Sequence, residues 1–226
     1  MPRIAVVGLG RFGTTLAREL TARGAQVIAI DRNLQLVNAI KDDVDVAVRL
    51  DSTDEAALMA QEFEKMDTCV VAIGENFEAA LLTTVIAKKL GVPQVVCRAQ
   101  TELHTEIFIR VGADDVIQPE MQVGEHLARR LASPQLKDYV TLAEGYTLIE
   151  LQAPSDFCGK TLVEAELRPR YDVNLIAIKR PMEATDDRPG ESYRVISVPK
   201  PAERILDGDV LVLIGSDEAL ERLPKE

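Results

Sequence analysis

The sequence predicts an α/β fold in which a doubly wound parallel sheet is followed by a further helix and a small α+β lobe. Two observations predict this fold. Over the first half of the chain, short apolar segments alternate with amphipathic segments of helical length, and after about residue 138 this alternation stops. Of the 226 residues, 46% are hydrophobic but only 4% are aromatic, so we expect an aliphatic core.

The first lobe is predicted from six strand candidates that are almost entirely apolar, as strands buried on both faces should be. They cover residues 4–7, 27–30, 44–48, 68–73, 94–98 and 115–117. Helix candidates lie between them at residues 12–23, 34–41, 55–65, 77–90 and 102–111. Strands that alternate with helices form βαβ units with right-handed crossovers, which predicts a parallel sheet.

The rest of the chain has a different pattern. A helix is predicted at residues 120–131, with Pro119 at its start. Strands are then predicted at residues 146–151, 174–178, 193–198 and 210–214, with short helices at 161–167 and 218–223 and a polar hairpin loop at 181–192. The predicted division is a first lobe at residues 1–118, a helix and linker at 119–137, and a small lobe at 138–226. From the residues alone, the helix either belongs to the first lobe or bridges to a partner.

Composition excludes several classes of protein. The net charge of −11 argues against a nucleic-acid partner, because such proteins need basic residues to neutralise phosphates. No segment approaches the roughly 20 apolar residues that a membrane span needs. The three cysteines, Cys69, Cys97 and Cys158, are too far apart for a zinc knuckle or a disulfide framework. We therefore expect a soluble, acidic, cytoplasmic protein.

The segment GLGRFG at residues 8–13 follows the first predicted strand and opens the first predicted helix. In this G-x-G-x-x-G spacing, Gly8 allows a tight turn, Gly10 lets the backbone approach a diphosphate, and Gly13 lets the helix pack closely on the strand. Asp31, which ends the second strand 18 residues after Gly13, is expected to accept hydrogen bonds from ribose hydroxyls and to repel a 2′-phosphate. The pattern predicts a Rossmann-like site for a nucleotide.

Further candidates for this site lie in the glycine loop or at the carboxyl ends of strands, where ligands bind in such sheets. They are Arg11, Phe12, Arg32, Asp51, Ser52, Ile73, Gly74, Asn76 and Arg98. Alternatives stay open for several of them. Arg11 is either a phosphate contact or a solvated arginine. Residues 51–53 either line an adenine pocket or cap a helix, and residues 74–76 either touch the ligand or cap the next helix.

Recognisable catalytic machinery is missing from the sequence. The two histidines, His104 and His126, lie in predicted helices, and no Ser/His/Asp set, metal motif or P-loop is present. We therefore expect a protein without enzymatic turnover. The competing hypothesis is a small NAD-dependent oxidoreductase, which would use the same glycine loop and Asp31. A Rossmann-type redox repressor is a weaker alternative, because no basic DNA-binding module is visible.

The ordered motifs of the chain resemble one family. Residues 8–13, 72–74 and 117–120, followed by 159–162 and 174–180, are similar to the cytosolic RCK regulators of potassium transport of the KtrA/TrkA type. The resemblance covers essentially the whole chain. It implies a Rossmann lobe, a crossover helix and a small C-terminal lobe, and a homodimer that assembles into an octameric ring.

The resemblance also implies a function. Such a ring docks on a separate membrane-embedded K⁺ transporter of the KtrB/TrkH type, at the inner face of the membrane, and gates it in response to ATP/ADP or NAD(H). By position, Arg11 matches a γ-phosphate sensor that acts across the dimer, and Glu120 matches an acid that helps hold Mg²⁺ or another divalent cation. A second ligand, cyclic di-AMP, is implied in the small lobe at Arg168, Asn174, Leu175 and Ile176. The resemblance leaves open which nucleotide pair is preferred.

Overall fold

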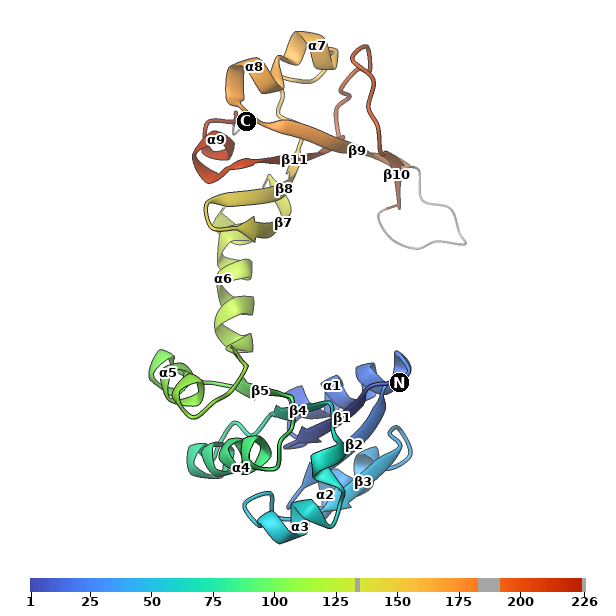
Figure 1. Cartoon of the computed structure of the whole chain (residues 1–226). Coiled ribbons are helices and arrows are strands. Elements are labelled where there is room, and N and C mark those ends of the chain that lie inside the picture. Colours follow the sequence, from blue (N-terminus) through green and yellow to red (C-terminus); the bar gives the residue numbers. More distant parts are fainter. Residues whose placement is uncertain (133–134, 183–191, 225–226) are drawn as a thin grey trace. The chain divides into compact units, whose positions relative to one another are not determined.

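The computed structural model describes residues 1–132, 135–182 and 192–224. The chain divides into two compact units, Met1–Val123 and Gly124–Glu226, each with its own sheet (Figure 1).

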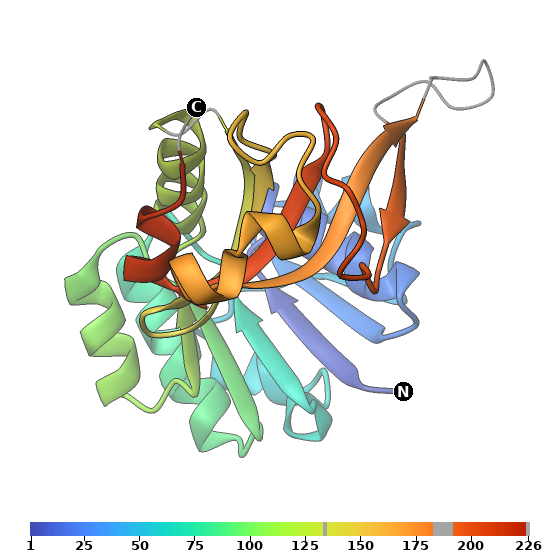
Figure 2. The same ribbon diagram turned by 90° about the horizontal axis from the view of Figure 1, so that it is seen from above.

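The first unit is built on a six-stranded sheet whose neighbouring strands all run parallel. Its strands are β1 (Arg3–Val7), β2 (Gln26–Asp31), β3 (Val46–Arg49), β4 (Thr68–Val71), β5 (Gln94–Arg98) and β6 (Asp115–Ile117). They lie in the order β3-β2-β1-β4-β5-β6, so β2 and β3 are added on one side of β1 and β4, β5 and β6 on the other (Figure 2). This is the strand order of a Rossmann sheet, and it confirms the predicted fold class.

Helices cover both faces of this sheet. They are α1 (Arg11–Ala22), α2 (Leu34–Ile40), α3 (Glu55–Met59), α4 (Phe77–Lys89) and α5 (Glu102–Arg110), with a short 3₁₀ helix η1 (Phe63–Lys65). On one face Ala17 of α1 and Val37 of α2 pack in a core with Val6 of β1. On the other face Leu58 of α3 and Phe108 of α5 share a core with β1 and β4. Successive residues of β1 point to opposite faces, which explains why both cores include this strand.

The predicted helix 55–65 is wrong in its second half. Helix α3 ends at Met59, and Glu62 adopts a left-handed backbone conformation with φ 55° before η1 begins. Leu58 and Phe63 are both fully buried. In one continuous helix these residues, five positions apart, would point about 140° away from each other, so the chain turns at Glu62 to bring Phe63 back to the core.

The second unit contains a five-stranded antiparallel sheet in the order β10-β9-β11-β8-β7. Its strands are β7 (Leu136–Ala143), β8 (Tyr146–Gln152), β9 (Asn174–Met182), β10 (Ser192–Ile196) and β11 (Val210–Ser216). Short helices α7 (Leu162–Ala165), α8 (Leu167–Tyr171) and α9 (Asp217–Glu221) accompany it. Phe157, Ile178 and Leu211 lie in its core. Helix α6 (Pro119–Ala132) runs from the first unit into the second.

Three local predictions differ from the structure of this unit. Strand β7 was not predicted. The helix predicted at 161–167 is divided by Glu166, which has φ 48°, into α7 and α8. Pro181 and Met182 extend β9 rather than belonging to the predicted hairpin loop, and residues 183–191 of that loop lie outside the described residues.

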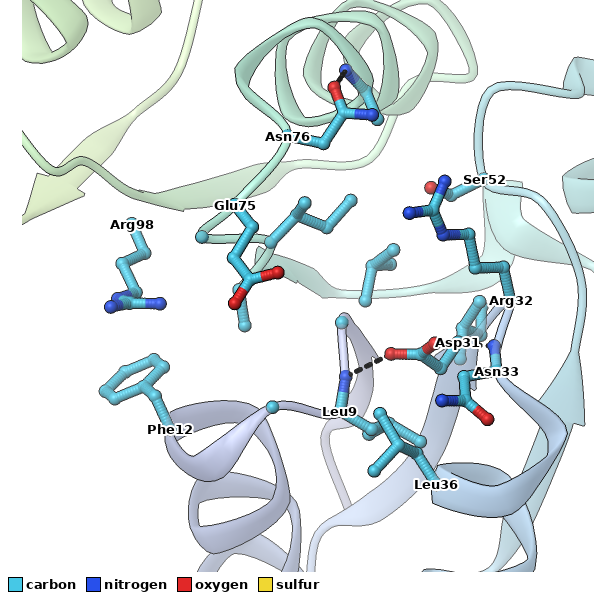
Figure 3. A pocket seen from close by; sticks show the side chains of 18 of the residues that line it. Leu9, Phe12, Asp31, Arg32, Asn33, Leu36, Ser52, Glu75, Asn76 and Arg98 are labelled. Atoms are coloured by element: carbon cyan, nitrogen blue, oxygen red, sulfur yellow. Dashed lines mark hydrogen bonds between the residues drawn. The ribbon is translucent and has the colours of Figure 1, made fainter.

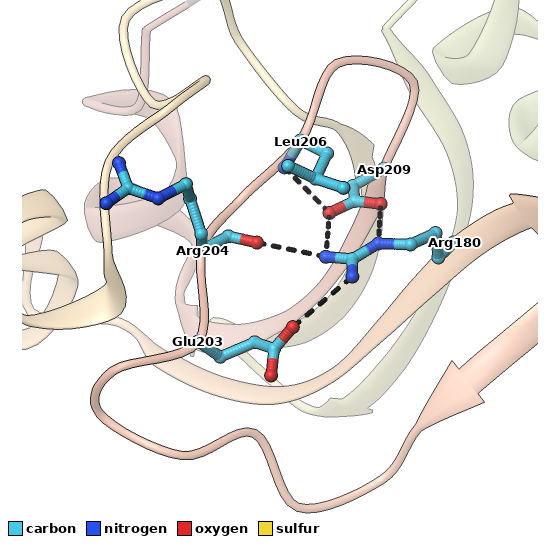
Figure 4. A network of polar contacts seen from close by, with 5 residues as sticks. All are labelled: Arg180, Glu203, Arg204, Leu206 and Asp209. Carbon is cyan, nitrogen blue, oxygen red and sulfur yellow. Dashed lines mark hydrogen bonds and ion pairs between the residues drawn. The ribbon is translucent and has the colours of Figure 1, made fainter.

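A buried ion pair joins β9 to the loop that precedes β11. Asp209 is completely buried, and its two carboxylate oxygens accept hydrogen bonds from Nε and Nη2 of Arg180, both at 2.9 Å (Figure 4). Arg180 also donates to the carbonyl oxygen of Arg204 and to Glu203, while Asp209 accepts from the backbone N–H of Leu206. The guanidinium group therefore holds the loop at three points.

Candidate functional site

A large cavity opens at the carboxyl ends of β1, β2, β3, β4 and β5. Its volume is about 1160 Å³. The predicted site residues that line it are Gly8, Gly10, Arg11, Phe12, Asp31, Arg32, Asp51, Ser52, Ile73, Gly74, Asn76, Arg98 and Glu120. In Figure 3, Phe12 and Arg98 lie at one end of this group, and Asp31, Arg32 and Ser52 lie at the other. The sheet thus gathers residues that are more than a hundred positions apart in the sequence.

The glycine loop has the geometry that its spacing predicts. Gly8 has φ 98°, and a Cβ atom there would come within 2.9 Å of the backbone nitrogen of Ile73. Gly13 does not line the cavity; a Cβ atom there would collide with the carbonyl oxygen of Gly8, so this glycine allows the close packing of α1. At Gly10 a Cβ atom would meet no atom within 4 Å. Gly10 therefore faces open space beside the turn.

The first turn of α1 is free to receive an anion. Gly10 is its N-cap and provides no side-chain hydrogen bond, and the first turn contains no acidic residue. Uncapped N–H groups and the partial positive charge of the helix dipole are available there. A phosphate group is the kind of ligand that such a helix terminus binds.

The carboxylate of Asp31 is held in place by two backbone groups. It accepts hydrogen bonds from the N–H of Leu9 (Figure 3) and from the N–H of Asn33, both at 2.7 Å. The sequence indicated a ribose contact at Asp31 but not this link between the glycine loop and the end of β2. Because each carboxylate oxygen has two lone pairs, the group keeps acceptor capacity for a ligand.

Three other cavity residues also have local structural roles. Asp51 accepts hydrogen bonds from the N–H and the hydroxyl of Thr53, which hold the pKa of Asp51 below its usual range. The hydroxyl of Ser52 is bonded to that of Thr83 at 2.7 Å in a buried position. Asn76 caps α4, because its side chain accepts from Ala79 N–H at 3.0 Å.

The alternative that residues 51–53 cap the next helix is wrong. The N-cap of α3 is Asp54, whose side chain accepts from the N–H of Ala57. Residues 51–53 instead form a turn stabilised by the Asp51–Thr53 contacts, and this turn lies on the cavity wall.

Arg98 and Glu120 form an ion pair at one end of the cavity. The Arg98 side chain is only 17% exposed, whereas that of Glu120 is 65% exposed. The hydrogen bond from Arg98 holds the pKa of Glu120 below its usual range. The guanidinium lies against Gly74, where a methyl group would collide with Nη1 of Arg98. Arg98 therefore needs a glycine at position 74 to reach this place.

A divalent cation would have little protein ligation here. Among the described residues, no group of three or more His, Cys, Asp or Glu side chains is arranged to hold a metal ion. Glu120 is a single carboxylate. It fits a cation such as Mg²⁺ only as one ligand among phosphate oxygens and water molecules, which is a common arrangement for Mg²⁺ at nucleotide sites.

A smaller cavity of about 340 Å³ lies in the second unit. Arg168, Asn174 and Leu175, three of the four residues predicted for a second ligand, line it together with apolar residues of α7 and α8. Ile176, the fourth, is not part of its wall, and its side chain is 45% exposed.

Within the described part of the chain, no helix is both long enough and apolar enough to cross a membrane.

Comparison with known proteins gives consistent matches over nearly the whole chain. Residues 4–119 match the TrkA-N domain family, and residues 146–226 match the TrkA-C domain family. Ktr system potassium uptake protein C of Bacillus subtilis (strain 168) is 36% identical over 221 residues, which cover 98% of this chain and 95% of that protein. Ktr system potassium uptake protein A of the same organism is 30% identical over 224 residues, covering 99% and 96%.

A solved structure shares the fold. The GsuK channel bound to NAD matches with a TM-score of 0.53 and 22% identity, over 98% of this chain and 37% of the channel chain. The parallel sheet with its glycine loop, the two domain matches and the identity to both Ktr proteins lead to one conclusion. The chain belongs to the TrkA-N/TrkA-C family, together with the Ktr system potassium uptake proteins.

Proposed function

We propose that this chain is a nucleotide-sensing regulatory subunit of a potassium-uptake system. The observation that carries the proposal is the large cavity, which is lined by the uncapped start of α1, the fixed carboxylate of Asp31 and the cationic side chain of Arg98. The names of the two Bacillus relatives support the potassium-uptake part, and the NAD bound to the GsuK channel supports the nucleotide part.

The cavity suggests how a nucleotide would lie. Asp31 would accept hydrogen bonds from ribose hydroxyls, and the diphosphate would lie over Gly10 at the start of α1. The candidates are ATP/ADP and NAD⁺/NADH, because both pairs share an adenosine diphosphate part. Arg11 would contact a γ-phosphate of its own or a partner chain, and Glu120 would share a divalent cation with the phosphates. The small cavity at Arg168 is the candidate site for cyclic di-AMP.

Regulation requires that the bound nucleotide favours one conformation of an assembly. A ligand can shift such an equilibrium only by the difference in its affinities for the two states. We infer a homodimer that assembles into an octameric ring, lies in the cytoplasm and gates a membrane-embedded K⁺ transporter of the KtrB/TrkH type. In this proposal the chain binds nucleotides and does not turn them over.

The test is calorimetric titration of the purified protein with ATP, ADP, NAD⁺ and NADH. Gly10→Asp places a negative charge beside the proposed diphosphate without a steric clash, and it should reduce affinity at least about tenfold. Gln26→Asp is the control, because Gln26 is exposed at the start of β2 and the substitution adds the same negative charge at the end of the sheet away from the cavity. No binding by the wild-type protein, or equal binding by both variants, would refute the proposal.

The same titration tests the sensor role of Arg11. Arg11→Ala should weaken ATP binding more than ADP binding, and an equal loss for both would exclude that role.

The competing function, a small NAD-dependent oxidoreductase, uses the same cavity and Asp31. It predicts a change in NADH absorbance when hydroxy-acid or sugar substrates are added, whereas a regulatory subunit predicts none.

A further inference from the structure

Arg98 is a largely buried cation that forms an ion pair with Glu120. Its side chain is 17% exposed, and its Nε atom is buried without a hydrogen-bond partner among the described residues. Its guanidinium lies against the backbone of Gly74 and donates through Nη2 to Glu120. A buried guanidinium without an anionic partner is strongly unfavourable, so some anion must satisfy Arg98 in every state of the protein.

Glu120 is a counter-ion that can separate from Arg98 with little loss of free energy. Its carboxylate is 65% exposed, so little water has been removed from it in the ion pair. It lies in the first turn of α6, where the helix dipole also favours a negative charge. Glu120 therefore remains stabilised after it separates from Arg98, whereas Arg98 does not remain stabilised without an anion.

Both residues line the large cavity, and Figure 3 shows Arg98 at the same end of the labelled side chains as Phe12. A phosphate carries more charge than a carboxylate and offers three acceptor oxygens, and arginine binds it with two parallel hydrogen bonds. A phosphate that reaches this end of the cavity would therefore compete directly with Glu120 for the guanidinium.

We propose that the Arg98–Glu120 ion pair is an internal lock in which Glu120 occupies the anion-binding face of Arg98 until a nucleotide phosphate replaces it. The exchange releases the first turn of α6 from the end of β5 and exposes the Glu120 carboxylate. Occupancy of the cavity is thereby coupled to the start of the helix that runs into the second unit. This inference rests on the proposed binding of a nucleotide in the cavity.

The experiment measures ADP affinity by calorimetry in the presence of a chelator, so that no divalent cation contributes. Glu120→Gln keeps the shape of the side chain but removes the competing charge, and it should bind ADP about fivefold more tightly than the wild type. Glu125→Gln, at another exposed position of α6, is the matched control and should leave the affinity unchanged. In an Arg98→Gln background, Glu120→Gln should have no effect.

Hydrogen exchange gives a second readout. In the wild type, ADP should increase exchange at the backbone amides of residues 120–123, and in Glu120→Gln exchange there should already be high without ADP. Binding by the wild type with equal or weaker binding by Glu120→Gln would overturn the lock while leaving the proposed function intact. No ADP binding by the wild type would overturn the lock, and no binding of ATP, ADP, NAD⁺ or NADH would overturn the proposed function as well. A gain that persists without Arg98 would also overturn the lock.

Discussion

Asp31 shows how one side chain can join the fold to the binding site. Its carboxylate accepts hydrogen bonds from Leu9 N–H in the glycine loop and from Asn33 N–H at the start of α2. A bound ribose would use lone pairs of a carboxylate that is already fixed in position. This fixed orientation reduces the ordering required when the ligand binds.

Replacing Asp31 should therefore affect both stability and binding. We expect Asp31→Ala to lower the free energy of unfolding by about 1–3 kcal/mol, because two N–H groups lose a charged acceptor. Adenine-nucleotide affinity should fall at least about tenfold, since charged hydrogen bonds to the ribose are lost. Urea unfolding and calorimetry measure the two effects. Asp43→Ala, which removes only an exposed ion pair with Arg18, is the control and should change neither by much. An unchanged stability of Asp31→Ala would contradict the structural role.

The sequence predicts the members of the site better than their contacts. The roles of Gly8, Gly10 and Gly13 follow from a short local pattern, because one turn geometry determines all three. The Arg98–Glu120 ion pair and the Asp31–Leu9 hydrogen bond join residues 22 positions apart, and they depend on which strands become neighbours. No local pattern encodes that, so these contacts could not be predicted from the spacing of residues.

At the scale of elements, Asp114, which directly precedes β6, links this strand to β5 and α4. Its Oδ2 atom accepts from Val95 N–H at 2.6 Å and pairs with Nζ of Lys88 at 3.0 Å. The hydrogen bond from Val95, followed by that from Lys88, holds the pKa of Asp114 below its usual value of 3.8. The ionised carboxylate is thus more stable in the folded protein than in the unfolded chain.

This direction gives a pH dependence. The contribution of Asp114 is complete above its unfolded pKa of about 3.9 and is lost as the pH falls through the lower folded pKa. At pH 7 we expect Asp114→Ala to lower the free energy of unfolding by about 1–2 kcal/mol. The loss is modest because the side chain is partly exposed. Urea titrations at pH 7, 5 and 3 should show the gap between wild type and variant closing only below about pH 4. A constant gap would exclude the ionic contribution.

In the second unit, the Arg180–Asp209 ion pair has the same joining role in a buried setting. Asp209→Ala leaves the guanidinium without its bidentate partner and the N–H of Leu206 without an acceptor. We expect the free energy of unfolding to fall by about 3–5 kcal/mol. Urea unfolding monitored by circular dichroism measures this loss. Glu203→Gln removes only the outer, partly exposed partner and should cost less than about 1 kcal/mol. A double variant that also carries Arg180→Met should lose less than the sum of the single losses; strict additivity would show that the pair is not coupled.

Strand β7 shows why some elements escape sequence reasoning. Alternation of buried and exposed residues normally reveals a strand, but the register of β7 against β8 shifts twice, between Leu136 and Asp138 and between Thr141 and Ala143. These irregularities interrupt the two-residue period. Strand β7 is also at the edge of the sheet, where only Leu136 and Tyr139 are half-buried, so its exposed apolar residues follow no burial pattern. The six strands of the first unit lack this problem because they form a regular parallel sheet.

For the whole molecule, helix α6 is the element that the two units share. Its apolar side chains at Val123, Leu127 and Leu131 are spaced four residues apart, which places them on one side of the helix. Their exposed fractions are 66%, 41% and 70% in the single chain. A continuous exposed apolar stripe on a helix is typical of a surface that another chain covers. The proposed homodimer supplies such a chain.

We expect Leu131→Glu to break this association without unfolding the chain, because the substituted side chain is exposed in the monomer and only a dimer would bury its charge. Size-exclusion chromatography with light scattering should give an even multiple of the chain mass for the wild type and a smaller species for the variant. Thermal unfolding of each species by circular dichroism tests whether the variant remains folded. Gln122→Glu, at an exposed polar position of the same helix, adds the same charge away from the stripe and should keep the wild-type mass. A monomeric wild type, or a variant that assembles normally, would show that α6 does not hold the assembly together.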